Sequence, residues 1–146
     1  MKSFKYTFLI LLLMSGVLLI SSFSSFQLEV WKAPPTADKL KNPAAYTEEN
    51  RVAGKKIFEG ICWTCHGLDG KGNGPASVQL NPKPANFSSD LVQSQTDGAL
   101  FYKITVGRGA MVTFSQTFTP LQRWQLVCYL RGFKSENDKS STQEIK

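Results

Sequence analysis

Two thiols and an imidazole lie within five residues of each other, in the segment Cys62-Trp-Thr-Cys65-His66. On a helix end, positions i, i+3 and i+4 project to one face. Two cysteines with this spacing can bond to the two vinyl groups of a haem while the histidine faces the iron. The motif therefore predicts one covalently bound haem c, attached through Cys62 and Cys65, with His66 as an axial iron ligand.

The scarcity of other ligands excludes competing chemistries. His66 is the only histidine, and Cys128 is the only cysteine outside the motif. A zinc site needs three or four Cys or His ligands, and the helical pattern around Cys128 favours a buried small hydrophobe there. A thioredoxin-like cysteine pair would need a βαβ setting, and the chain shows no such pattern.

A second axial ligand is sought among His, Met, Cys and Lys. Met111 is the one methionine outside the apolar N-terminal stretch, and it lies in the segment Gly107-Arg-Gly-Ala-Met111-Val. The flanking glycines let the backbone turn tightly and approach a flat ring. Elimination and loop context thus predict Met111 as the second iron ligand, with an open or differently ligated iron as the alternative. A His/Met pair raises the reduction potential relative to two histidines.

Three helical patterns surround these residues. The first covers 47–61 and would deliver Cys62 to the haem. The second begins at residues 96–97 and ends at Gly107, just before the Met111 loop. The third begins with the capping box Thr119-Pro-Leu-Gln122, ends at Gly132, and would pack its apolar face on the first.

The connection 67–95 is rich in Gly, Pro and Asn. A long irregular loop is unusual in a compact domain unless it wraps something, and a haem offers the surface. Its segment 69–74 lacks the regular carboxylates of a calcium loop and the Gly-Lys-Ser/Thr sequence of a phosphate loop. The predicted fold class is all-α, with three to five helices and long loops around one haem.

The remaining segments flank a working domain at 47–133. Residues 1–30 carry two lysines followed by an uncharged stretch, which predicts a signal peptide or an N-terminal membrane anchor and export to the periplasmic side of a bacterial membrane. The segment 31–46 contains three prolines and is predicted to be an extended spacer. Residues 134–146 are predicted to form a disordered polar tail. The net charge of +6 is too mild to predict nucleic-acid binding.

With these residues placed, the chain resembles the bacterial class I monohaem c-type cytochromes. The resemblance covers about 47–133 and rests on C-x-x-C-H-G, a Gly-rich loop and Gly-x-x-x-Met. It implies a small cytochrome c fold, thioether bonds from Cys62 and Cys65, His66 as the proximal ligand and Met111 as the distal ligand.

The resemblance also implies a helix crossing and a hydrogen bond to the proximal histidine. Gly54 and Phe58 match the family's positions on the first helix, and Leu126 and Tyr129 match the facing positions on the last.

Pro75 is the candidate for the loop proline whose carbonyl orients His66, with Pro82 and Pro84 as alternatives. One position departs from the family, because Val112 replaces the proline that usually follows the ligand methionine.

The resulting functional prediction is an electron carrier and not an enzyme, with no catalytic residue. It would pass single electrons between a donor reductase and an acceptor oxidase or reductase, at the membrane or in the periplasm of a respiratory chain. Lys71, Lys83 and Lys103 are candidates for steering an acidic partner, although solvated surface charge is the favoured explanation for any single one. The alternative is a haem subunit docked permanently in a respiratory or dehydrogenase complex. A gas sensor or peroxide-reactive protein is less favoured, since no histidine remains for acid-base chemistry.

Overall fold

The computed structural model describes residues 30–143, with side chains for residues 30–134. The predicted leader therefore lies outside the described residues, apart from its last position. Within the described range, no helix combines the length and the apolar character needed to cross a bilayer.

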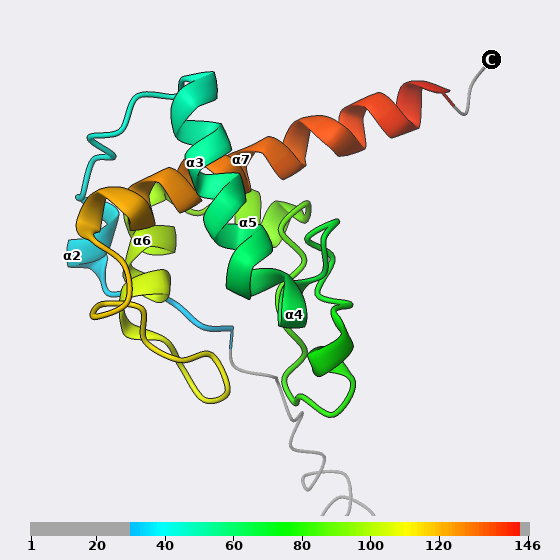
Figure 1. Ribbon diagram of the computed structural model, residues 1–146, viewed down its shortest axis with the longest axis horizontal. Helices are drawn as coiled ribbons and strands as arrows, with labels where there is room; N and C mark the ends of the chain where they lie inside the picture. The colour runs from blue at the N-terminus through cyan, green and yellow to red at the C-terminus, as the bar shows by residue number, and fades with distance from the viewer. Residues whose placement is uncertain (1–29, 144–146) are drawn as a thin grey trace, which may run out of the picture. The chain divides into compact units, whose positions relative to one another are not determined.

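The described chain from Trp31 onward is helical, with one isolated β-bridge between Arg108 and Met111 (Figure 1). The all-α prediction is confirmed. The helices are α2 (Pro35–Asp38), α3 (Glu48–Ile57), a π-helical turn (Phe58–Cys62), α4 (Trp63–His66), a 3-10 turn (Pro75–Ser77), α5 (Asp90–Gln93), α6 (Asp97–Val106) and α7 (Pro120–Gln143).

The three longest helices begin at threonine caps. The Oγ1 atoms of Thr47 and Thr96 each accept a hydrogen bond from the backbone N–H three residues on, at 3.3 and 3.0 Å. At α7 the capping box is reciprocal: Gln122 N–H donates to Thr119 Oγ1 at 3.2 Å, and Thr119 N–H donates to Gln122 Oε1 at 2.8 Å. Because side chains satisfy these otherwise unpaired amides, the helix starts follow directly from local sequence.

Helix α3 packs on α7, as the sequence predicts (Figure 1). The crossing depends on Gly54, which is buried and has no Cβ; a Cβ there would overlap the backbone carbonyl of Gln125. The contact is reinforced by a hydrogen bond from Gln125 Nε2 to Asn50 Oδ1 at 3.0 Å. The two helices therefore meet backbone to backbone.

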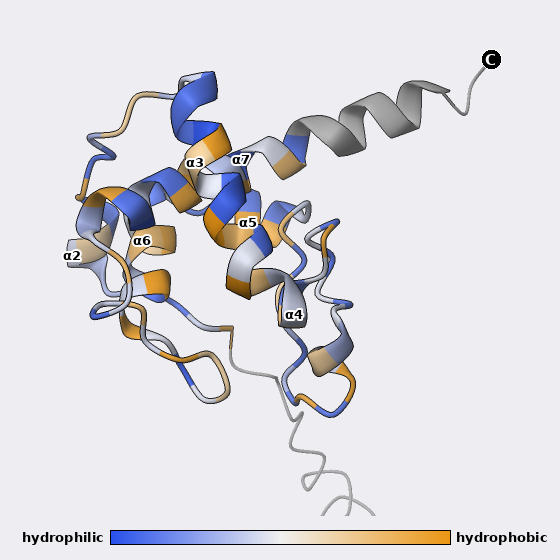
Figure 2. Ribbon diagram, viewed as in Figure 1, coloured by the Kyte–Doolittle hydropathy of each residue, from blue (hydrophilic) through white to orange (hydrophobic). Residues whose placement is uncertain are grey.

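An aromatic core fills the space beside this crossing. Phe58 is 1% exposed, and its ring lies 5.2 Å from that of Tyr129 and 5.6 Å from that of Phe133. Leu126 and Cys128 belong to the same core, and burial raises the pKa of the Cys128 thiol. Figure 2 shows hydrophobic and hydrophilic residues alternating along α3 and α7, which fits helices with one buried face.

The segment 31–46 is not the extended spacer predicted from its prolines. It contains α2, which packs on α6, and Gly98 of α6 lies so close that a Cβ would overlap the carbonyl oxygen of Ala37. Ala37 and Ala44 are both buried. Proline fits the first turn of a short helix, so the prolines shape this segment without keeping it from packing.

A hydrogen-bond network centred on Asp97 fastens the end of this segment. Asn42 Nδ2 donates to Asp97 Oδ2 at 3.2 Å, and the Tyr46 hydroxyl donates to the same oxygen. The other carboxylate oxygen accepts from Arg131 of α7 at 2.8 Å. Residues 31–46 are thus held to both α6 and α7 and form part of the domain.

At the other end, the backbone remains helical through Gln143, where the sequence predicted a disordered tail from residue 134. Gly132 does not end the helix either. A glycine costs a helix interior only about 1 kcal/mol relative to alanine, and no proline follows to break the hydrogen bonds.

Candidate haem-binding site

The C-x-x-C-H segment begins where the first long helix changes its winding. After Ile57 the helix widens into the π turn Phe58–Cys62 and then tightens into α4, which ends at Gly67 with φ of +75°. The sequence predicts a regular helix to residue 61, and its periodicity gives no sign of the extra residue in the turn. Cys62 is the last residue of the π turn, and Cys65 and His66 lie in α4. All three residues are half-buried.

The Gly-rich loop folds back over the end of α4. The amide of Gly72 donates to the His66 carbonyl at 2.8 Å, and the amide of Gly74 donates to the Cys65 carbonyl at 3.1 Å. A Cβ on Gly74 would overlap the carbonyl oxygens of Trp63 and Thr64. Backbone contact of this closeness explains the glycine and fixes the orientation of the short helix.

The imidazole of His66 is positioned on two sides. Its Nδ1 lies 3.3 Å from the carbonyl oxygen of Ala85, and its ring stacks on Phe87 with centroids 4.5 Å apart. Burial lowers the pKa of His66, with the Ala85 carbonyl acting in the opposite direction, so the neutral ring is favoured. A proton on Nδ1 facing a carbonyl leaves the Nε2 lone pair available to a metal.

The carbonyl facing His66 is therefore that of Ala85 and not that of Pro75. Pro75 begins the 3-10 turn Pro75–Ser77. The chain returns to the imidazole later, after Pro84, where the amide of Phe87 donates to the Gly70 carbonyl at 2.8 Å. This pairing between two parts of the loop sets which carbonyl lies beside the ring.

The thiol of Cys62 lies in an environment that favours its protonated form. Burial, and to a smaller extent the neighbouring Cys65, raise the pKa of the Cys62 thiol to about 12. Redox-active and metal-binding cysteines have lowered pKa values because the thiolate is the reactive form. The environment of Cys62 therefore disfavours thiolate chemistry and leaves an S–H group.

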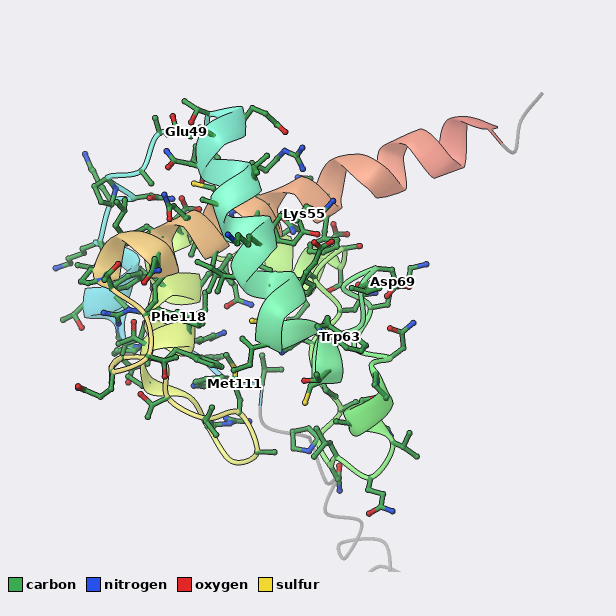
Figure 3. The ribbon with its side chains drawn as sticks, in the orientation of Figure 1. Glu49, Lys55, Trp63, Asp69, Met111 and Phe118 are labelled. Atoms are coloured by element: carbon green, nitrogen blue, oxygen red, sulfur yellow. The ribbon has the colours of Figure 1, made fainter. Side chains whose placement is uncertain are left out.

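Met111 lies on the loop between α6 and α7 (Figure 3). The turn is closed by two hydrogen bonds, from Arg108 N–H to the Met111 carbonyl at 2.8 Å and from Met111 N–H to the Arg108 carbonyl at 3.1 Å. Gly107 starts it with φ of +66°, as the tight turn predicted here requires. The half-buried side chain of Met111 and that of Trp63 both contact the hydrophobic core.

The sequence model of the family described as Cytochrome c matches residues 52–134, more than half of the chain. The chain belongs to the cytochrome c family. It therefore carries covalently bound haem c, a group that supplies one-electron chemistry.

Two solved structures are similar to the chain. A chain of the Kuenenia stuttgartiensis reducing HAO-like protein complex Kustc0457/Kustc0458 is 28% identical with a TM-score of 0.57, over 66% of the cytochrome and 48% of that chain. The cytochrome thus spans about half the length of that neighbour. The KustC0563 c-type cytochrome is 29% identical with a TM-score of 0.47, over 56% of this chain and 96% of that one. None of the curated proteins matches the cytochrome.

The donor set of the cytochrome fits a haem c. A histidine whose Nδ1 faces a carbonyl, two cysteine thiols in the same short segment and a thioether on a second loop are the groups that haem c uses. The lysines considered for partner steering have local contacts: Lys83 Nζ donates to the carbonyls of Ser77 and Val78 at 3.0 and 2.7 Å, and Lys71 Nζ lies 3.9 Å from Asp69.

Proposed function

We propose that the cytochrome transfers single electrons through a haem attached at Cys62 and Cys65, with His66 and Met111 as the axial ligands. The observation that carries the proposal is the placement of His66. Its Nδ1 faces the Ala85 carbonyl, which fixes the tautomer and leaves Nε2 as the metal-binding nitrogen. A half-buried neutral imidazole with this orientation matches an iron ligand better than a fully exposed histidine.

The chain's residues would hold the haem in three ways. Cys62 and Cys65 fix it covalently, the glycine loop keeps α4 in place, and Met111 offers a soft thioether from the α6–α7 loop. The bound haem supplies reversible one-electron chemistry. Because a thioether favours ferrous iron, the His66/Met111 pair would raise the reduction potential relative to two histidines. With both axial positions filled, electrons would leave through the haem edge.

We place this activity in a respiratory chain on the periplasmic side of a bacterial membrane, between a donor reductase and an acceptor oxidase or reductase. The leader predicted at residues 1–30 supports export, and with it a membrane link if it is retained. A second candidate is a subunit docked permanently in a complex. It is favoured by the likeness to a chain of the Kuenenia stuttgartiensis reducing HAO-like protein complex. Co-purification of the tagged full chain with a stoichiometric membrane complex favours the subunit, and purification alone favours the shuttle.

The axial ligand is tested by visible absorption of the haem-loaded full chain. The oxidised wild type is expected to show the weak methionine-to-iron charge-transfer band, and the reduced wild type to resist carbon monoxide. In Met111→Ala the band should vanish and carbon monoxide should bind. Val112→Ala, a change at the exposed neighbour, is the matched control and should behave as wild type. Ready binding of carbon monoxide by the wild type would contradict the closed carrier and favour a gas sensor.

A further inference from the structure

Trp31 contacts the part of the chain that carries Met111. Its indole ring lies 5.3 Å from Arg108 Cζ and 5.5 Å from Lys103 Nζ, measured to the ring centroid. Both distances are within the range of about 6 Å at which a cation is attracted to an aromatic face. Lys103 belongs to α6, whereas Arg108 lies in the turn that follows it.

Arg108 transmits this contact to Met111 through the backbone. The two residues exchange both of their amide hydrogen bonds, so that displacement of one displaces the other. The turn contains two glycines, and Met111 also contacts the hydrophobic core. Gly107 and Gly109 have φ of +66° and +59°, and the residue after Met111 is an exposed valine. Glycine is the residue with the greatest backbone freedom, so an outside contact has a large influence on this turn.

Trp31 can act as a support because its own segment is anchored. Residues 35–38 pack on α6, and Asn42 and Tyr46 bind Asp97. The two cations near the ring also repel one another: burial and, next, the charge of Arg108 lower the pKa of Lys103. Removal of the ring would take away a contact that both cations share.

We infer that Trp31 is a positioning residue that keeps the Met111 turn in place and thereby slows the entry of outside ligands to the iron. The inference rests on the proposed ligation by Met111 and adds a role for the segment 31–46. It predicts that the segment 31–46 controls how readily the distal ligand leaves the iron.

The test is the rate at which imidazole displaces the distal ligand in the oxidised, haem-loaded full chain. It is followed by stopped-flow loss of the charge-transfer band at saturating imidazole, where departure of the methionine limits the rate. Trp31→Ala should raise this rate about three- to tenfold, as expected from two cation–π contacts of modest strength. Trp31→Phe keeps an aromatic face, and its displacement rate should lie between those of the wild type and Trp31→Ala.

Two controls separate positioning from a general loss of stability. Lys32→Ala changes the exposed neighbour of Trp31 and should leave the rate unchanged. Val92→Ala removes methyl groups from a buried residue of the core and should lower stability to urea without changing the rate. An unchanged rate in Trp31→Ala would overturn the inference, and so would an equal rise in Val92→Ala. A wild type without the band would instead refute ligation by Met111, and the role of Trp31 would fall with it.

Discussion

The two sides of the proposed haem site are held in different ways. On the histidine side, the carbonyls of Cys65 and His66 accept hydrogen bonds from the glycine loop, and the imidazole lies between a carbonyl and the ring of Phe87. On the methionine side, Met111 lies in a short turn closed by its own two hydrogen bonds. Support for that turn comes from Trp31, in a different part of the chain.

This difference teaches how one small domain can combine a permanent and an adjustable ligand. The histidine belongs to a helix that is packed against two other segments, so its position is fixed by the fold. The methionine belongs to a turn whose glycines give it freedom, so its position depends on contacts from outside the turn. We therefore expect changes near His66 to affect assembly and changes near Met111 to affect ligand exchange.

The largest effect is expected from the thiols. The double variant Cys62→Ala, Cys65→Ala removes both attachment points, and its haem should become fully extractable into acidified organic solvent. Cys128→Ala is the matched control, because this cysteine lies in the core of α7 and should leave the haem covalently bound. Covalent haem in the double variant would contradict the assignment of the attachment site.

Two glycine variants compare the sides directly. Gly74→Ala forces a methyl group against two backbone carbonyls beside α4 and should reduce the free energy of unfolding by about 3 kcal/mol. Gly109→Ala has open space around the new methyl group and should cost only about 1 kcal/mol, from its positive φ. Urea denaturation of the two haem-loaded variants measures both values. Equal decreases in the free energy of unfolding would contradict the proposed difference between the two loops.

A smaller, pH-dependent effect is expected from Tyr46. Burial, followed by the hydrogen bond to Asp97, raises the pKa of the phenol to about 12, against about 10 in the unfolded chain. Because the folded state favours the protonated phenol, this contribution to stability is complete below about pH 10 and is lost as the pH rises toward 12. Urea midpoints measured through this range should fall more in wild type than in Tyr46→Phe. Parallel curves would mean that the Asp97 network contributes no such linkage.

Features set by neighbouring residues could be predicted from the sequence. The threonine caps, the C-x-x-C-H motif and the Met111 turn each depend on residues within a few positions of each other. The packing of α3 on α7 was also predictable, because a small residue at position 54 and an apolar face on the last helix match the family's crossing. The resemblance to the family indicated which residues of the two helices face each other, and the local sequence pattern alone did not.

The features missed depend on contacts between distant segments. The hydrogen bond from Phe87 to Gly70 determines which carbonyl faces His66. The sequence does not reveal this bond, so the family's loop proline pointed to Pro75 and not to Ala85. Residues 31–46 bury single alanines and make side-chain hydrogen bonds to Asp97, and neither feature has a periodicity that the sequence would reveal. The support of the Met111 turn by Trp31 was missed for the same reason.

The most direct test of the His66/Met111 site is iron X-ray absorption of the oxidised, haem-loaded full chain. Extended fine structure distinguishes a sulfur from a nitrogen or oxygen bound to the metal. Ligation by His66 and Met111 predicts one sulfur in the first coordination shell of the wild type, and its loss in Met111→Ala. A first shell of nitrogen and oxygen alone in the wild type would contradict the proposed site.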